Sequence, residues 1–316
     1  MSEFGWSSTT DEVLAGIDLS GRTVFITGAN SGLGRETARA MASRGAHVIM
    51  AGRDQAKLDE AVAAIQAGHP KAQLDTITVD LGSLENIRAA TSRARQRFQK
   101  IDLLINNAGV MATPFLHTAD GFEMQFGTNH LGHFALTGEL FPLIERGHLK
   151  RIVNLSSRGH HFAPVDFEDP HFERRAYDPW TSYGHSKTAN VLFTVGLEAR
   201  FAVLGIHAYA VHPGGIQTNL GRHMTPEMME ALMARVTSKD TGFQWKTIPQ
   251  GAATSCWAAT APELEGKGGI YCEDCHVAEV DDESTTGGVR SYAVNSSYAD
   301  RLWAMSEDAT GVRYPS

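Results

Sequence analysis

Tyr183 and Lys187 lie four positions apart in a segment with a helical pattern and could together carry out proton transfer. Side chains four apart share one face of a helix, so the ammonium of the lysine can approach the phenol. A nearby cation favours the phenolate and lowers a tyrosine pKa from about 10 toward the range of a general acid or base. We therefore expect Tyr183 to be the proton carrier, although this spacing alone is more typical of an exposed helix pair.

A glycine-rich segment, residues 27–34 (TGANSGLG), follows a predicted strand and opens a predicted helix. Its glycines allow a tight turn and close approach of a ligand, and the helix N-terminus offers free N–H donors to a pyrophosphate. The alternative is a turn needed only for packing. We assign to cofactor binding Gly28, Asn30, Ser31, Gly32, Leu33 and Gly34.

The choice of cofactor depends on residues 51–54 (AGRD), just after the second predicted strand. Enzymes that use NAD commonly place an acidic residue there to accept hydrogen bonds from the ribose 2′-hydroxyl. This chain has Gly52 followed by Arg53, and a guanidinium suits a 2′-phosphate. The sequence predicts NADP(H), with Asp54 as a carboxylate that could favour NAD instead.

These segments fall in a regular alternation of short β-branched runs and longer helical patterns, which predicts βαβ units around a parallel sheet. No linker or repeat marks a second domain, so we expect one Rossmann-type, doubly wound α/β domain. Strands are predicted at 23–27, 47–51, 74–79, 102–106, 151–155 and 207–211, with an edge strand at 269–272. Helices are predicted at 33–44, 55–67, 83–98, 121–145, 183–202 and 250–260.

Several further motifs occur in a fixed order along this alternation: NNAG at 106–109, Asn129, the serine pair 156–157, Tyr183 with Lys187, and Pro213-Gly214. With the glycine-rich loop, they resemble the short-chain dehydrogenase/reductase family over roughly residues 19–275. Within it, the sequence is most similar to the retinol dehydrogenase and WW-domain oxidoreductase branch. Protochlorophyllide reductases are more distant relatives.

The resemblance implies roles for individual residues. Ser157 would hydrogen-bond the substrate oxygen, while Ser156 supports the strand end. Asn129 would organise a water that passes the proton onward, or alternatively bond only local backbone. Lys187 would also hold the ribose hydroxyls. Further cofactor contacts are implied for Tyr183, Asp80, which would contact adenine, and for Leu81, Asn107, Ala108, Gly109, Pro213, Gly214 and Thr218.

Four segments complete the predicted organisation. We expect an N-terminal arm at 1–18, the NADP-binding catalytic domain at 19–275, a substrate-covering lid at 214–248 within it, and a C-terminal arm at 276–316. Flexible thioethers adapt to irregular apolar ligands, although a methionine stripe is also typical of a packed helix. The lid carries Met224, Met228, Met229 and Met233, and the facing wall would use Phe162, Phe167 and Trp180.

The composition of the chain argues against several other classes of protein. The 316 residues are 42% hydrophobic and 20% charged, with a net charge of −8 and no basic block, so nucleic acid is not expected as a partner. No apolar run predicts a signal peptide or membrane span, and we expect a cytoplasmic protein. The segment from Cys272 to His276 matches a pattern for haem attachment. No second cysteine pair is present to complete a zinc site, and we expect no metal.

The sequence thus predicts an NADP(H)-dependent oxidoreductase that interconverts an alcohol and a carbonyl compound, on a bulky apolar substrate of retinoid, steroid or aromatic type. Family resemblance suggests a homodimer or homotetramer. There are two rival hypotheses. One is an NADP(H)-binding, redox-responsive interaction module with little turnover. The other is an enzyme that reduces a double bond, as protochlorophyllide reductases do. A sugar epimerase is less consistent with the spacing of Gly28, Gly32 and Gly34.

Overall fold

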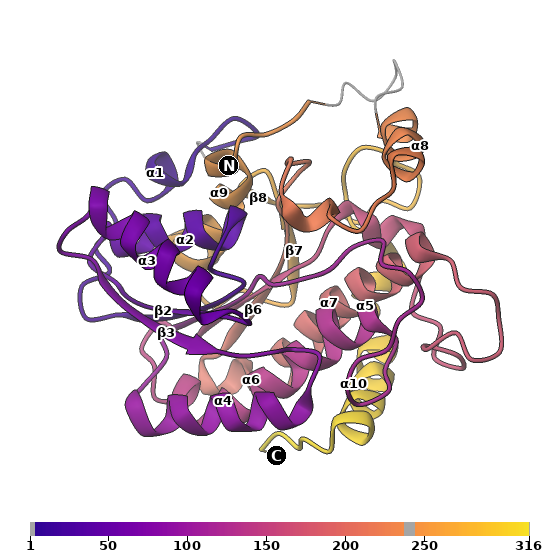
Figure 1. Cartoon of the computed structure of the whole chain (residues 1–316), viewed down its shortest axis with the longest axis horizontal. Helices are drawn as coiled ribbons and strands as arrows, with labels where there is room; N and C mark the ends of the chain where they lie inside the picture. The colour runs from indigo at the N-terminus through magenta and orange to yellow at the C-terminus, as the bar shows by residue number, and fades with distance from the viewer. Residues whose placement is uncertain (1–3, 237–243, 316) are drawn as a thin grey trace.

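A central β-sheet organises the chain in the computed structural model, which describes residues 4–236 and 244–315 (Figure 1). The strand order is β3-β2-β1-β4-β5-β6-β7-β8, with β1 to β7 parallel and β8 antiparallel. The bounds are β1 Thr23–Thr27, β2 His47–Gly52, β3 Gln73–Thr78, β4 Leu103–Asn106, β5 Arg151–Leu155, β6 His207–His212, β7 Ile270–Glu273 and β8 His276–Val277. The predicted parallel sheet in a single domain is confirmed.

One strand prediction needs correction. The run at 269–272 was expected to form the sheet edge, but β7 is flanked on its outer side by the two-residue β8. The turn between them places Asp274 and Cys275 at positive φ angles of 47° and 57°, a conformation that non-glycine residues rarely adopt. The Cys-x-x-Cys-His pattern therefore forms this tight hairpin.

Helices cover both faces of the sheet and bury two separate apolar cores (Figure 1). Helices α1, α2, α3 and α9 pack on one face, and α4, α6 and α7 pack on the other. The helix bounds are α1 Thr10–Val13, α2 Gly32–Ala42, α3 Gln55–Gly68, α4 Leu84–Arg97, α5 Met124–Phe126, α6 Gly132–Glu145, α7 Pro179–Phe201, α8 Pro226–Val236, α9 Ile248–Thr260 and α10 Ser296–Thr310. A capping box between Thr9 and Glu12 begins α1.

Two predicted helices differ from the structure. The segment 121–145 is divided into α5, a π-helical turn at Gly127–Leu131 and α6. Helix α7 begins at Pro179, four residues before the predicted start, because the Asp178 carboxylate accepts a hydrogen bond from Thr181 N and caps the helix. Both differences affect the candidate site, since one concerns Asn129 and the other the helix that carries Tyr183.

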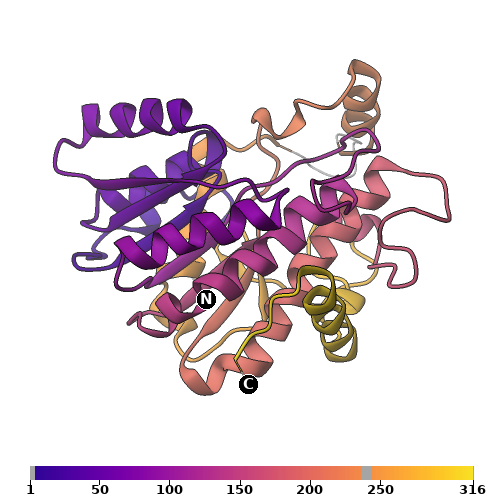
Figure 2. The same ribbon diagram turned by 60° about the horizontal axis from the view of Figure 1, so that its bottom comes forward.

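The segment 276–315 packs closely against the rest of the domain. Figures 1 and 2 both show α10 beside α7, and Trp303 on α10 is 5% exposed and packs against Phe134 and Phe193. The Tyr314 hydroxyl donates a 2.7 Å hydrogen bond to the Phe134 carbonyl. The residues expected to form a C-terminal arm thus extend the second core.

The strand order also locates the crevice of the sheet. The chain runs outward from β1 to β3 and then crosses to β4, on the other side of β1. In such sheets the connections after β1 and β4 leave in opposite directions, and ligands bind at the carboxyl ends of these two strands. Gly28 and Asn107 follow the two strands and lie at this position.

Candidate active site

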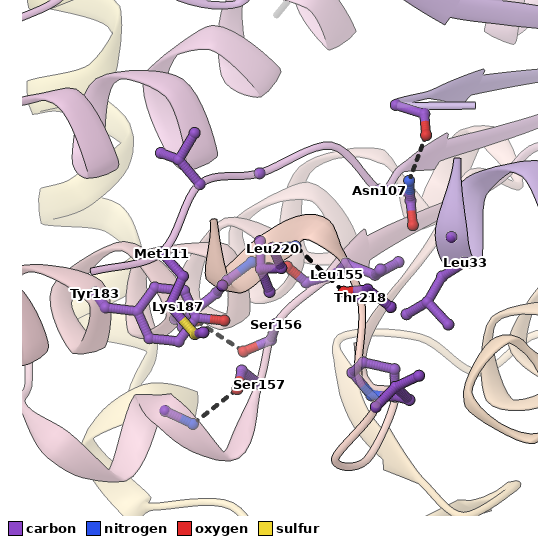
Figure 3. Close-up of a pocket in the computed structure, with 18 of the residues that line it drawn as sticks. Leu33, Asn107, Met111, Leu155, Ser156, Ser157, Tyr183, Lys187, Thr218 and Leu220 are labelled. Atoms are coloured by element: carbon purple, nitrogen blue, oxygen red, sulfur yellow. Dashed lines mark hydrogen bonds between the residues drawn. The ribbon is translucent and has the colours of Figure 1, made fainter. Parts of the chain in front are cut away.

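A cavity of about 1220 Å³ extends along the carboxyl ends of the strands. It is larger than the roughly 300–1,000 Å³ of an ordinary ligand pocket, which leaves room for a dinucleotide and a second ligand. All predicted cofactor-contacting residues line it, from the glycine-rich loop to Thr218. Figure 3 shows Tyr183, Lys187 and Ser157 at one end and Leu33 and Asn107 at the other.

The glycine-rich loop packs tightly against the end of β4. A Cβ atom on Gly34 would lie 2.4 Å from the Gly28 carbonyl oxygen and 2.5 Å from Asn107 Nδ2, so only glycine fits there. Asn107 Nδ2 donates a 2.7 Å hydrogen bond to the Thr27 carbonyl. Ser31 begins α2 without a side-chain capping bond, so the first N–H groups of this helix remain directed at the cavity.

A buried hydrogen-bonded chain joins the end of β1 to the π-helical turn. Thr27 Oγ1 accepts hydrogen bonds of 2.9 Å from the N–H groups of Asn107 and Ala108 and lies 2.9 Å from His133 Nε2. His133 Nδ1 lies 2.9 Å from the Asn129 carbonyl. A carbonyl oxygen only accepts, so Nδ1 carries the proton and Thr27 donates to Nε2. Burial lowers the pKa of His133 to about 4, which keeps the ring neutral.

Asn129 is fully buried behind the cavity wall and does not line the cavity. Its Oδ1 accepts from Val110 N at 2.8 Å, and its Nδ2 donates to the Val110 carbonyl and to Ser186 Oγ, each at 2.9 Å. The side chain thus bonds nearby backbone and fastens the loop after β4 to α7. A Cβ atom on Gly109 would lie 3.1 Å from Asn129 Oδ1 and 3.8 Å from Lys187 Nζ, which places these two groups close together.

Tyr183 and Lys187 lie on one face of α7, as their spacing predicts, with Lys187 Nζ 5.6 Å from the centre of the tyrosine ring. The expected lowering of the tyrosine pKa is not found. Burial raises the pKa of Tyr183 to about 12, against the opposing effect of a hydrogen bond with Ser157. Burial also lowers the pKa of Lys187 to about 8. Burial dominates both pKa shifts because both side chains are less than 5% exposed.

The two adjacent serines at the end of β5 make different contacts (Figure 3). Ser156 Oγ donates to the Lys187 carbonyl at 2.9 Å. Ser157 Oγ accepts from Gly159 N at 2.9 Å, caps the following 3₁₀ turn and lies at Tyr183. Both serines line the cavity, but Ser156 joins the strand to α7, while Ser157 lies beside the phenol.

Sequence reasoning missed the buried asparagines that support this arrangement. Asn106 Nδ2 donates to Asn154 Oδ1 at 2.8 Å across β4 and β5, and Asn154 Nδ2 donates to Thr194 Oγ1 on α7 at 2.9 Å. The Leu155 carbonyl accepts both Lys187 Nζ at 3.0 Å and Asn190 Nδ2 at 2.9 Å. Asn154 in the otherwise apolar run 152–155 was the available signal, because a buried polar side chain requires a partner.

Arg53 follows the end of β2 and lines the cavity, as the glycine-rich loop does. The Asn30 Oδ1 atom lies 3.4 Å from where a Cβ atom on Gly52 would be. Asp54 is the N-cap of α3, where its Oδ1 accepts from Lys57 N at 3.2 Å and its Oδ2 lies 3.7 Å from Lys57 Nζ. The Asp54 carboxylate, which could favour NAD, therefore binds to α3, the helix that follows it.

The opposite end of the cavity is mainly apolar, with polar groups at its margin. Phe162 and Trp180 line it as expected, with ring centres 5.9 Å apart. Met111, Met224 and Met229 also line the cavity, and the last two lie beside Gly221, next to Arg222. Three expected residues differ. Phe167 packs against Tyr298 of α10, Met228 does not line the cavity, and the side chain of Met233 lies outside the described residues.

A loop from the C-terminal segment also forms part of the wall, and sequence reasoning gave no indication of it. Thr285, Thr286, Gly287 and Arg290 line the cavity. Arg290 N donates to His160 Nε2 at 3.2 Å, and His160 Nδ1 lies 2.7 Å from the Ser157 carbonyl. The loop is therefore hydrogen-bonded through His160 to Ser157, the serine beside Tyr183.

All three cysteines are buried as free thiols, and no group of His, Cys, Asp or Glu among the residues that the structure describes could hold a metal ion. Within the same residues, no helix is both long and apolar enough to cross a bilayer.

The family model for short chain dehydrogenases matches residues 22–229, and the chain belongs to this family. It is 43% identical over 298 residues to a Streptomyces lividans protein named "Probable oxidoreductase", covering 92% of this chain and 98% of that protein. It is 40% identical over 298 residues to human retinol dehydrogenase 12, covering 94% and 89%. The structure of an uncharacterized protein from Mycobacterium paratuberculosis superimposes with a TM-score of 0.73 at 36% identity, covering 95% and 97%. The chain is thus an oxidoreductase related to the retinol dehydrogenase branch.

Proposed function

We propose that this protein interconverts an alcohol and its aldehyde or ketone with NADP(H) as hydride carrier. The observation that carries the proposal is the placement of Ser157 and Tyr183 side by side in the cavity wall, with Lys187 one helical turn from the tyrosine. A bound nicotinamide would supply or accept the hydride. The protein supplies the proton, a hydrogen bond to the substrate oxygen and a cavity for both ligands.

In the direction of reduction, Tyr183 donates its phenolic proton to the substrate oxygen while the Ser157 hydroxyl donates a hydrogen bond to the same oxygen. The C–O double bond becomes a single bond, and the proton lost by Tyr183 becomes the hydroxyl proton of the product. Lys187, charged below its pKa of about 8, stabilises the tyrosinate that remains. Asn129 and Leu155 hold the lysine and its surroundings in place.

The residues present fit a dinucleotide. The Gly28–Gly34 contact is too close for any other side chain, and the uncapped N-terminus of α2 offers donors to a pyrophosphate. Ser31, Thr218 and Lys187 line the same cavity and would hold phosphate and ribose groups. NADP(H) is favoured over NAD(H) because Arg53 faces the cavity, while Asp54 caps α3 and pairs with Lys57.

The substrate that suits the other end of the cavity is bulky and largely apolar. Phe162, Trp180 and Met111 line this part of the wall, and Met224 and Met229 from the segment after β6 line the cavity as well. Aromatic rings and thioethers offer polarisable surface to a retinoid-like, steroid-like or aromatic carbonyl compound.

A panel of carbonyl compounds and alcohols, followed by nicotinamide absorbance with both cofactors, tests the proposal. We expect turnover with NADPH or NADP⁺ that is fastest on large apolar substrates. Nucleotide binding without turnover on any compound would favour the interaction-module hypothesis. The homodimer or homotetramer stays a prediction, which size-exclusion chromatography with light scattering would test.

A further inference from the structure

Two arginines from distant parts of the chain line the cavity in segments that meet the glycine-rich loop. A Cβ atom on Gly52, which precedes Arg53, would lie 3.4 Å from Asn30 Oδ1, and a Cβ atom on Gly32 would lie 3.5 Å from Thr218 Cγ2, four residues before Arg222. Arg53 follows β2, and Arg222 follows the 3₁₀ turn Asn219–Gly221 in the segment after β6. Neither guanidinium has a carboxylate within 4.0 Å among the residues that the structure describes, unlike the arginines at 39, 97, 151, 175 and 200. Arg222 Nη1 donates a 3.0 Å hydrogen bond to the Asn219 carbonyl, which leaves other donors of the guanidinium free.

The cationic character of this part of the cavity wall is not balanced locally. Asp54, the acidic residue that follows Arg53 on the cavity wall, already caps α3 and lies 3.7 Å from Lys57. Burial lowers the pKa of Arg222, and the charge of Arg53 lowers it further. Burial also lowers the pKa of His223, and the charges of Arg222 and Arg53 add to that shift. Like charges that converge on a cavity without a counterion repel one another, and a bound anion would relieve that repulsion.

We propose that Arg222 binds the 2′-phosphate of NADP(H) together with Arg53, so that the segment after β6 takes part in cofactor selection. The inference rests on the proposed function, since it assigns a second ligand to the phosphate that distinguishes NADP(H) from NAD(H). A phosphate dianion offers three acceptor oxygens, enough for two guanidinium groups on different sides. Arg53 is supplied by the sheet and Arg222 by a loop.

This assignment also links cofactor choice to the substrate end of the cavity. The segment that carries Arg222 continues directly into Met224, Met229 and Leu232, which line the cavity as well. A phosphate that holds Arg222 therefore restrains the chain that brings these apolar side chains over the substrate. NADP(H) should order residues 219–232 more than NAD(H) does, and it should lower the KM for a large apolar substrate.

The test is a comparison of the Kd for NADP⁺ and NAD⁺ by calorimetry in the wild type, Arg222→Met, Arg222→Lys and Arg35→Met. Arg35 is a matched control because it is an exposed arginine on α2, outside the large cavity. We expect Arg222→Met to weaken NADP⁺ roughly 5- to 20-fold, as for a partly exposed charge-assisted hydrogen bond. Binding of NAD⁺ should change less than twofold, Arg222→Lys should recover part of the loss, and Arg35→Met should leave the ratio of the two Kd values unchanged.

The outcomes separate this inference from the proposed cofactor. If the wild type prefers NADP⁺, and Arg222→Met keeps that preference within twofold, Arg222 is not a phosphate ligand and only the inference fails. If the wild type binds NAD⁺ as tightly as NADP⁺, the proposed cofactor and the inference both fail. Hydrogen exchange gives an independent readout, in which NADP⁺ should protect residues 219–232 more than NAD⁺ in the wild type and equally in Arg222→Met. Equal protection in the wild type would overturn the coupling.

Discussion

The Ser156 hydroxyl donates a 2.9 Å hydrogen bond to the backbone carbonyl of Lys187 and so fastens α7 to the end of β5. Its neighbour Ser157 faces the cavity beside Tyr183. We therefore predict different effects for the two alanine variants. Ser156→Ala should lower the free energy of unfolding by about 1–3 kcal/mol, because a buried carbonyl loses a partner. Ser157→Ala should mainly lower kcat. Urea denaturation and steady-state kinetics on both variants check this, and the reverse pattern would contradict it.

Tyr183→Phe should reduce kcat by about 10²- to 10⁴-fold while the Kd for NADP⁺ stays close to that of the wild type, because the change removes the transferable proton and little volume. Tyr177→Phe is the matched control. Tyr177 is a half-buried tyrosine, bonded to the Thr113 carbonyl at 3.0 Å and away from the cavity. Stopped-flow turnover and fluorescence titration measure the two quantities. Turnover of Tyr183→Phe within a few-fold of the wild type would remove Tyr183 from the acid/base role.

The pH dependence of reduction should follow Lys187. Burial lowers the pKa of Lys187 to about 8 and raises the pKa of Tyr183 to about 12, so both groups are protonated below about pH 8. Above that pH the lysine loses the charge that stabilises tyrosinate, while the phenol keeps its proton. We expect kcat/KM for reduction to be level below pH 8 and to fall by up to about tenfold per pH unit above it. A profile that stays level to pH 10, with the fold intact by circular dichroism, would be inconsistent with this role.

Arg53→Ala should weaken NADP(H) more than NAD(H). Loss of a guanidinium from a phosphate should cost on the order of 1–3 kcal/mol, whereas NAD(H) offers only a hydroxyl at that position. Calorimetric Kd values for both cofactors provide the measurement, and Arg35→Ala is a useful control because Arg35 is an exposed cation on α2 that lies outside the large cavity. Equal losses for the two cofactors would show that Arg53 does not select the phosphate.

Shortening Met224 and Met229 to alanine should raise the KM for large apolar substrates several-fold and leave the Kd for NADP⁺ nearly unchanged. Both side chains line the cavity, and Met229 is 38% exposed, so thermal stability should also change little. Met228→Ala is the matched control on the same helix, since Met228 does not line the cavity. A double variant that melts much earlier would instead indicate a core role, because burial of a methionine contributes about 2–5 kcal/mol.

The sequence alone determined the family, the sheet and most of the cavity wall. Parallel strands buried on both faces appear as continuous apolar runs, so six strands were predicted to within one residue at each end. The glycine-rich loop was also evident, because a Cβ atom at position 34 would meet the Gly28 carbonyl oxygen at 2.4 Å and no other residue type fits. Local steric limits and hydrophobic periodicity depend on residues that lie close together in the chain. Both can therefore be recognised in the sequence without the structure.

Only the tertiary structure decided which polar groups meet across the fold. The chain from Thr27 through His133 to Asn129 spans about a hundred positions of sequence, and His160 is joined to Arg290 over a similar distance. The pKa of Tyr183 was also beyond sequence reasoning, because it depends on how completely the surrounding chain excludes water from the phenol. The presence of Arg53 and Arg222 in the wall of one cavity is of the same kind, since it follows from the path of the segment after β6 and not from either residue's neighbours in the sequence.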